Sequence, residues 1–310
     1  MAIKRWVLKA IVQKTISYLP GSHTINYVFQ KYVTKGVNLS DEYFYDRLGH
    51  ARDHLRSYRS FAGADVPAVC LEIGTGWYPV VPISFFLAGA TTIYSVDIEF
   101  LTSKDRLRTT LLKFTEALAS GALAAHVRVR PERYAVLTNV LESLEQLSLN
   151  EALKRLHIEY LIEDARKLSL PADSIDLVNS NNTFEHIYAE MIAPILAEFK
   201  RVVKKERGVM SHFIDMSDHF AHFDRTITIY NFLQFSPARW QLINNSIQPM
   251  NRLRIYDYRK IWTDLGIPIS AETVRPGLPD ELATLPLDAA YADKPPREVA
   301  ISHCHLVSAF

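Results

Sequence analysis

The chain has 310 residues, of which 48% are hydrophobic, and a formal net charge of +1 at pH 7. This content suffices to bury a full core, so a globular protein is expected, whereas the balanced charge and the absence of a basic run argue against nucleic acid as a partner. The two cysteines, Cys70 and Cys304, lack the number and spacing of a disulfide or zinc framework, which favours a cytoplasmic location.

Residues 3–19 predict an amphipathic helix, because Ile3, Val7, Ala10, Ile11 and Tyr18 fall on one helical face. Lysines interrupt every apolar run here, so no signal peptide is expected, and no later segment reaches the roughly 18 uncharged residues of a membrane span. Such a helix most often covers a domain core. Peripheral contact with a membrane, through the basic face and Trp6, is the alternative.

A second helix is expected over residues 40–61, where Ser40 and Asp41 form a good N-cap and aromatic residues follow. Residues 1–66 are therefore expected to form a helical N-terminal cap. Residues 67–310 are expected to form the main domain.

From residue 67 onward, strands and helices alternate. Strands are expected at residues 68–74, 92–98, 159–163, 175–180, 208–215, 267–274 and 299–307. The first five are separated by helical segments, which indicates parallel pairing with right-handed crossovers. The pattern predicts an α/β fold, a doubly wound, Rossmann-like and mostly parallel seven-stranded sheet. Two long insertions, at about residues 101–157 and 217–256, are expected to add helices.

A glycine turn and an acidic residue follow the first two predicted strands. The run LEIGTGWYPVV, residues 71–81, turns from strand to helix through Gly74 and Gly76, and glycine lets a ligand approach the backbone closely. Asp97 ends the next strand, where a carboxylate can accept hydrogen bonds from vicinal ribose hydroxyls. Trp77 and Tyr78 crowd the space that a dinucleotide pyrophosphate would need. A nucleoside cofactor without pyrophosphate is therefore favoured.

With these motifs the chain resembles the class I S-adenosylmethionine-dependent methyltransferases, in particular the bacterial group related to ubiquinone-pathway and small-molecule O-methyltransferases. The resemblance covers about residues 68–215, departs from the family motif at its third glycine, which is Tyr78 here, and makes 67–310 the methyltransferase domain. It implies S-adenosylmethionine as methyl donor. It also implies donor contacts at Glu72, Gly74, Thr75, Gly76, Trp77, Asp97, Ile98, Asp164, Ala165 and Asn181.

Candidate catalytic residues follow the fourth and fifth predicted strands, whose carboxyl ends face the ligand side of such a sheet. A hydroxyl acceptor must lose a proton, and histidine titrates near neutral pH. His219 and His212 are the preferred bases, and His186 comes after them.

A magnesium ion is an alternative to a histidine base. Some ubiquinone-pathway O-methyltransferases carry a Glu-x-x-Glu-His metal site after the fourth strand, and Glu185 and His186 match its last two positions. Its first position is Asn182 here, so Asp215 or Asp218 would have to supply the missing carboxylate.

The acceptor is expected to be a small molecule or a glycan hydroxyl. Aromatic residues are expected to roof its pocket, and arginines interleaved with them are candidate anion ligands, although both sets suit a plain core or surface equally well. These are Tyr43, Phe44, Tyr45, Phe220, Phe223, Tyr230, Phe232, Phe235 and Trp240, with Arg225, Arg239, Arg252 and Arg254. N- or C-methylation and a non-catalytic scaffold with the same fold are the alternatives. The sequence carries no indication of the oligomeric state.

Overall fold

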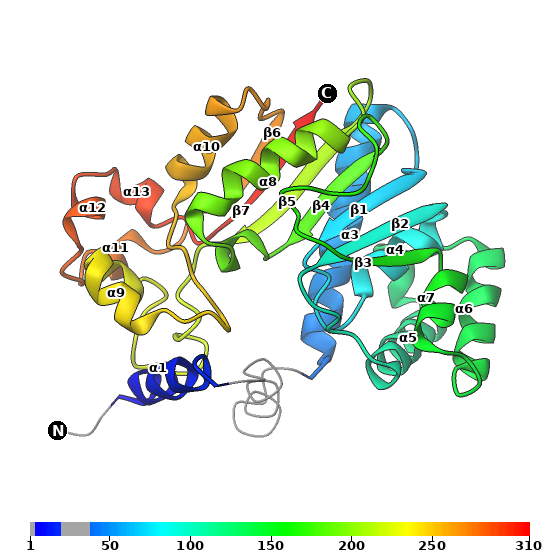
Figure 1. The fold of residues 1–310 in the computed structure, drawn as a ribbon, viewed down its shortest axis with the longest axis horizontal. Helices are drawn as coiled ribbons and strands as arrows, with labels where there is room; N and C mark the ends of the chain where they lie inside the picture. Colours follow the sequence, from blue (N-terminus) through cyan, green and yellow to red (C-terminus); the bar gives the residue numbers. More distant parts are fainter. Residues whose placement is uncertain (1–3, 20–37) are drawn as a thin grey trace.

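The computed structural model describes residues 4–19 and 38–310, and these contain one seven-stranded sheet (Figure 1). The strands are β1 Val69–Ile73, β2 Thr92–Asp97, β3 Ile158–Ile162, β4 Leu177–Asn181, β5 Val209–Asp215, β6 Ala271–Arg275 and β7 His303–Ala309. Their order in the sheet is β3-β2-β1-β4-β5-β7-β6. Pairing is parallel from β3 to β5, and β7 is antiparallel to both of its neighbours. The predicted doubly wound, mostly parallel sheet is confirmed.

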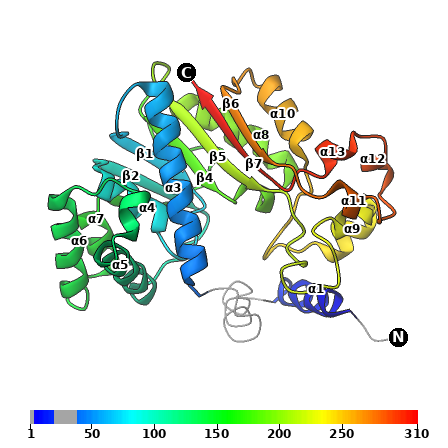
Figure 2. The same ribbon diagram turned by 180° about the vertical axis from the view of Figure 1, so that it is seen from behind.

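Helices cover both faces of this sheet (Figures 1 and 2). One face carries α3 Asp41–Ala62 and α4 Val80–Ala88, with α5 Lys104–Ala119, η2 Ala122–Ala125, α6 Pro131–Ser143 and α7 Leu149–Arg155 beyond them. The other carries α8 Ala189–Val202 and α10 Ile255–Asp264. The short helices are η3 Phe184–His186, η4 Asn231–Gln234, α9 Pro237–Ile243, α11 Pro279–Leu282, α12 Ala289–Ala292 and α13 Pro296–Val299.

The long helix α3 lies directly against the sheet. Ser40 caps its first turn by accepting a hydrogen bond from the Tyr43 N–H, and Gly63 ends it with φ of 69°. Phe44, Leu48 and Leu55 lie on its buried face and join the same hydrophobic cluster as α4 and the sheet. This packing brings the polar side chains of α3 next to β4 and β5.

The first helix, α1 Arg5–Ile16, packs on the segment that follows β5. Its Trp6 ring lies 5.9 Å from the Phe220 ring and 5.8 Å from the Phe235 ring, and these residues share a small core with Trp240. The helix covers this core as expected, but its buried residues are Trp6, Ala10, Gln13 and Ile16, whereas Ile11 and Tyr18 of the predicted apolar face are exposed. Ile3 lies outside the described residues. Membrane contact through this helix stays a prediction. In the described ranges 4–19 and 38–310, no helix is long and apolar enough to cross a membrane.

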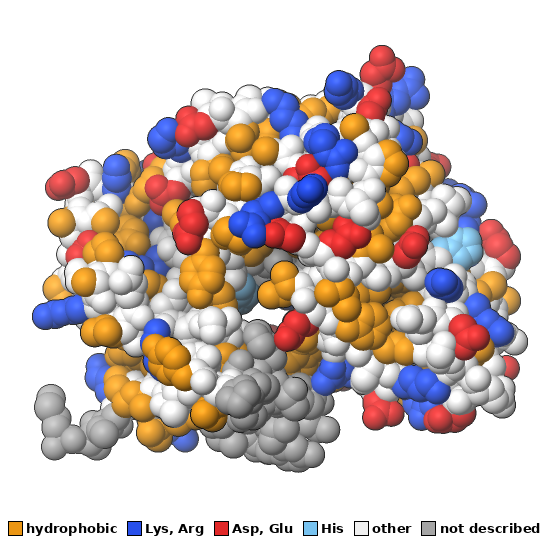
Figure 3. Space-filling view, viewed as in Figure 1, with side chains coloured by type: hydrophobic (Ala, Val, Ile, Leu, Met, Phe, Trp, Pro, Cys, Tyr) orange, Lys and Arg blue, Asp and Glu red, His pale blue; other side chains and the backbone are white. Residues whose placement is uncertain are grey.

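Strand boundaries differ from the prediction mainly at the C-terminal end. The predicted strand 267–274 begins only at Ala271, and the predicted strand 299–307 begins at His303, because α13 extends to Val299 and a short turn follows it. The insertion over residues 101–157 forms helices as expected, whereas residues 217–256 hold η4, α9 and the first residues of α10 among loops. On the face shown in Figure 3, acidic and basic side chains are interspersed, in keeping with the nearly neutral composition. The division into a cap over residues 1–66 and a main domain stays a prediction.

Candidate functional site

A large pocket lies at the carboxyl ends of the parallel strands, with a volume of about 1350 Å³. The motif residues after β1, β2, β3 and β4 meet in its walls, as expected for an open α/β sheet. All the residues predicted to hold the donor line this pocket, namely Glu72, Gly74, Thr75, Gly76, Trp77, Asp97, Ile98, Asp164, Ala165 and Asn181. Of the predicted bases, His186 and His219 line it as well.

The glycine turn after β1 brings the backbone to the pocket wall. Gly74 has φ of 73°, and a Cβ atom there would lie only 2.4 Å from Cγ2 of Thr183 on the neighbouring loop. Gly76 also has positive φ, 68°, but its Cβ would meet nothing closer than 4.0 Å. Gly74 therefore needs glycine for both its conformation and its space, and Gly76 for its conformation. The turn leaves a surface without side chains on which a nucleoside ligand fits.

Two carboxylates in this part of the pocket, the buried Glu72 and the half-buried Asp97, have raised pKa values. Burial raises the pKa of Glu72 to about 7, although Thr75 and Asn181 donate hydrogen bonds to its two oxygens at 2.6 and 2.8 Å. Burial also raises the pKa of Asp97 to about 6, opposed by backbone N–H groups of Ile98, Glu99 and Gly76. A ligand that brings a positive charge or hydrogen-bond donors to these two carboxylates would stabilise their ionised forms.

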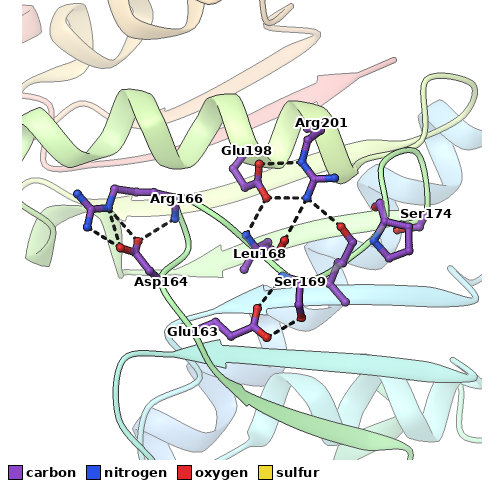
Figure 4. A network of polar contacts seen from close by, with 10 residues as sticks. Glu163, Asp164, Arg166, Leu168, Ser169, Ser174, Glu198 and Arg201 are labelled. Atoms are coloured by element: carbon purple, nitrogen blue, oxygen red, sulfur yellow. Dashed lines mark hydrogen bonds and ion pairs between the residues drawn. The ribbon is translucent and has the colours of Figure 1, made fainter.

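The loop after β3 places Asp164 at the pocket, and Figure 4 shows its carboxylate beside Arg166. Hydrogen bonds from Arg166 lower the pKa of Asp164 to about 2, so its carboxylate is ionised. Arg201 of α8 holds the next part of this loop, because its guanidinium donates to the carbonyl of Leu170 at 2.8 Å and pairs with Glu198. These contacts from α8 thus hold the loop in place.

A second polar cluster follows β5 and includes His303, which the sequence analysis did not single out. Asp215 ends β5, with Oδ2 3.2 Å from Nε2 of His219 and Oδ1 3.4 Å from Nε2 of His303 on β7. Burial alone would raise the pKa of Asp215, but the hydrogen bonds from the two histidines outweigh it and hold that pKa below its ordinary value. His222 stacks on His219 with ring centroids 5.3 Å apart.

Glu185 and His186 lie on η3 beside this cluster. His186 Nδ1 lies 2.8 Å from the carbonyl oxygen of Pro249, so Nδ1 carries the proton and Nε2 keeps its lone pair. Burial, followed by Asp215, raises the pKa of Glu185 well above its usual range. Neither of its carboxylate oxygens has a hydrogen-bond partner of normal geometry among the described residues. Glu185, His186 and His219 each offer a ligand atom, and these atoms lie within 4.8 Å of one another.

The structure does not bring His212 to the pocket. Its Nδ1 bonds the Ser180 hydroxyl at 2.9 Å, and its ring packs against Phe184 and Phe199 in the core on the other side of the sheet. Of the predicted aromatic roof, only Tyr43 lines the pocket. The buried guanidinium of Arg252 donates to the carbonyls of Phe232 and Phe235 instead of facing a ligand.

Sequence reasoning missed three parts of the site. His303 approaches through strand pairing, Arg47 reaches the pocket from α3, and residues Ser246, Ile247, Gln248 and Pro249 form one wall. The alternation His303, Cys304, His305 in a predicted strand was a usable signal, because it puts two histidines on one face. The loop 246–249 carries no such signal.

Substitution of Gly74 tests the tight turn. We expect Gly74→Ala to abolish measurable binding of S-adenosylhomocysteine, because the new Cβ meets Thr183 and the backbone conformation becomes strained. Gly63→Ala is the matched control, since Gly63 has a similar φ of 69° with nothing within 4 Å of its Cβ position. It should cost about 1 kcal/mol of stability and leave the affinity unchanged. Calorimetric titration and thermal unfolding measure both, and normal binding by Gly74→Ala would contradict the assignment.

Binding of the donor should weaken at low pH. Glu72 and Asp97 accept hydrogen bonds from a ligand much more strongly when ionised, and their raised pKa values of about 7 and about 6 move protonation into the neutral range. Affinity for S-adenosylhomocysteine should therefore fall as the pH drops through these values, by up to about tenfold per pH unit for each group. In Asp97→Asn the step near the lower value should vanish. An affinity that stays constant across this range would refute the assignment.

Comparison with known proteins finds one domain match and several structures of low sequence identity. Residues 117–210 match the family described as a methyltransferase domain, and no curated protein matches the chain. Among solved structures, the chain is similar to the 1,6-didemethyltoxoflavin-N1-methyltransferase of Burkholderia thailandensis, with 10% identity over 100% of this chain and 91% of that one and a TM-score of 0.46.

Two further solved structures are similar at comparable levels. The magnesium protoporphyrin IX methyltransferase of Synechocystis has 13% identity over 93% of this chain and 98% of its own, with a TM-score of 0.45. A Nostoc punctiforme protein provisionally described as an O-methyltransferase has 12% identity over 84% of this chain, with a TM-score of 0.41, and this chain spans 57% of its length. The match over residues 117–210, the sheet order and the glycine turn agree with the resemblance of the sequence motifs to class I S-adenosylmethionine-dependent methyltransferases.

Proposed function

We propose that this chain methylates a hydroxyl oxygen of a small acceptor, with His219 as the base that removes the hydroxyl proton. The contact between Asp215 and His219 carries the proposal, because it lies in the wall of the pocket that holds the predicted donor residues. A histidine held by a buried carboxylate is a recurrent way to orient a general base.

The pairing fixes which nitrogen of His219 can take up a proton. Asp215 accepts at Oδ2 from Nε2 of His219, so in the neutral ring Nε2 carries the hydrogen and Nδ1 keeps its lone pair. Stacking on His222 and an edge contact with His186, at 4.7 Å between ring centroids, restrict rotation of this ring. Nδ1 of His219 is thus the atom assigned as base.

The negative charge of Asp215 favours transfer of the acceptor proton to His219. Asp215 stays ionised because His219 and His303 lower its pKa, so a positive charge that forms on His219 meets a fixed negative charge. The bound donor supplies a methyl carbon on a positively charged sulfur. His219 takes the acceptor proton while the acceptor oxygen bonds this carbon, and the electron pair of the broken carbon–sulfur bond stays on sulfur. Positioning of the two reactants supplies much of the rate.

The remaining walls favour a small acceptor that combines apolar and polar groups. Ile187, Tyr188 and Met191 line one side, while Tyr43 and Arg47 of α3 line another. The Arg47 guanidinium lies 4.8 Å from the Tyr43 ring centroid, and its buried Nε has no hydrogen-bond partner among the described residues. An acceptor with an oxygen-rich group, including a sugar unit, fits these donors.

The role of His219 predicts a specific kinetic pattern. In a panel of hydroxyl and amine acceptors, release of S-adenosylhomocysteine should appear with hydroxyl acceptors. We expect His219→Gln to lower kcat by about 10²- to 10⁴-fold, and Asp215→Asn by a smaller factor, with unchanged affinity for S-adenosylhomocysteine. His126→Gln is a suitable control, because His126 lines no part of the pocket.

Two other results would contradict O-methylation and support one of the alternative functions. Turnover of amine acceptors alone, with full activity in His219→Gln, would support N-methylation and leave the histidines as binding residues. Absence of S-adenosylhomocysteine binding by the wild-type protein would support the non-catalytic scaffold.

A divalent cation is a second candidate for activating the acceptor, favoured by the unpartnered oxygens of Glu185. The ligand group that the geometry supports is Glu185, His186 and His219, whereas Asp215 is already engaged by two histidines. Two imidazoles with one carboxylate suit Zn²⁺ better than Mg²⁺.

The cation alternative has its own test. If a cation is required, calorimetric titration of chelator-treated protein with ZnCl₂ should show one saturable site that is lost in Glu185→Gln, and activity should depend on added metal. Full turnover in the presence of a chelator, without binding of Zn²⁺ or Mg²⁺, would exclude the cation.

A further inference from the structure

A chain of buried hydrogen bonds runs from β7 through the interior to the donor side of the pocket. It links His305 on β7, Ser211 on β5, His54 on α3, Asn181 on β4 and Glu72 on β1. The contacts are His305 Nε2 to Ser211 Oγ at 2.8 Å, Ser211 Oγ to His54 Nδ1 at 2.7 Å, His54 Nε2 to Asn181 Oδ1 at 3.0 Å and Asn181 Nδ2 to Glu72 Oε1 at 2.8 Å.

The donor and acceptor atoms of these residues allow only one direction of donation along this series of hydrogen bonds. The Glu72 carboxylate has no hydrogen when ionised, so the Asn181 amide must turn its NH₂ group toward it and its oxygen toward His54. That oxygen needs a donor, so the proton of neutral His54 lies on Nε2. His54 Nδ1 must then accept the hydrogen of Ser211, whose oxygen in turn accepts from Nε2 of His305.

The surroundings exclude the opposite direction. Burial lowers the pKa of His54 well below its usual range and the pKa of His305 to about 4, so each ring carries a single N–H near neutral pH. Arg47 lies 3.1 Å from Nδ1 of His50, which is the other histidine near Asn181 Oδ1. Since a guanidinium only donates, Nδ1 of His50 acts as an acceptor, and the donor to Asn181 is His54.

Ring packing on Phe213 holds His54 and His305 of this hydrogen-bonded series in place. The ring of Phe213 is stacked between His50 and His305, each with a centroid distance of 3.9 Å, and His54 meets its edge at 5.1 Å. His54 and Ser211 are fully buried and line no part of the pocket, whereas Asn181 and Glu72 do. The chain therefore reaches the ligand only through its last two members.

We propose that His54, Ser211 and His305 are positioning residues for the methyl donor, which act through Asn181 to orient the Glu72 carboxylate toward the donor's amino-acid end. Glu72 projects beside the glycine turn, where an ammonium group of the ligand would replace the solvation that burial removes. The proposal rests on the donor site proposed above.

The experiment compares two ligands that differ only in the part that Glu72 would hold. S-adenosylhomocysteine carries an amino-acid end, and 5′-methylthioadenosine lacks it. We expect Ser211→Ala to weaken S-adenosylhomocysteine roughly five- to tenfold and to leave 5′-methylthioadenosine within about twofold, because one oriented hydrogen bond is lost. Ser211→Thr, which keeps the hydroxyl, should restore the affinity.

Ser180→Ala is the matched control. Its hydroxyl bonds the buried His212 on the other face of the sheet, so its loss should lower stability without changing the affinity for either ligand. If Ser211→Ala does not fold, His305→Phe serves in its place, since it keeps the stacking on Phe213 and removes the donor. Nitrogen NMR of the wild-type histidines should also show His54 protonated at Nε2.

Several results would overturn the proposal. These are wild-type affinity for S-adenosylhomocysteine in both Ser211→Ala and His305→Phe, an equal loss for the two ligands, or a His54 proton on Nδ1. Failure of the wild-type protein to bind either nucleoside would instead refute the donor site itself, and the proposal with it.

Discussion

The buried carboxylate of Glu72 is the interaction on which the donor side of the pocket depends. Burial of a lone carboxylate costs several kcal/mol, and hydrogen bonds to a charged group each return about 1.5–3 kcal/mol. Thr75 and Asn181 supply two such bonds, yet the pKa of Glu72 still rises to about 7, which corresponds to roughly 3 kcal/mol of penalty left uncompensated. A cationic ligand group beside this carboxylate would remove that penalty. The free site is thus held in a state that favours the ammonium of a methyl donor.

Successive side chains of β5 point to opposite faces of the sheet, so the residues proposed to position the ligands lie on one face and the core residues on the other. Ser211, Phe213 and Asp215 point to the face covered by α3, whereas His212 points to the face covered by α8 and α10. One face of this strand therefore carries the chain that ends at Glu72 and the carboxylate that holds His219. The other face carries core packing only. His212 lies in the core for this reason, whereas His219 follows the strand and contacts Asp215.

The meeting of the proposed donor residues in one pocket could be predicted from sequence because they lie in local motifs. The turn at Gly74, the acid at Asp97 and the loop at Asp164 each follow a strand directly, and parallel strands bring such segments to one edge. His303 and His305 could not be placed in this way, because their partners on β5 are set by the antiparallel register of β7. The aromatic residues after β5 were ambiguous for another reason. Composition does not tell a pocket wall from a small core, and the helix α1 buries Phe220 and Phe235 as core.

Arg254 explains how the irregular segments around His219 and His303 keep one geometry. Its guanidinium is fully buried and donates to the carbonyl oxygens of Met216, Val299 and Ile301, while the Met216 N–H donates to the Ser302 carbonyl at 2.7 Å. Met216 directly follows Asp215 and leads to His219, and Ser302 directly precedes His303. The same arginine thus fixes both chain segments that supply histidines to Asp215. Because a buried guanidinium without a carboxylate partner is costly, the carbonyls must stay in place to solvate it. The geometry of the proposed base is therefore maintained by backbone groups outside the pocket, where sequence motifs give no sign of it.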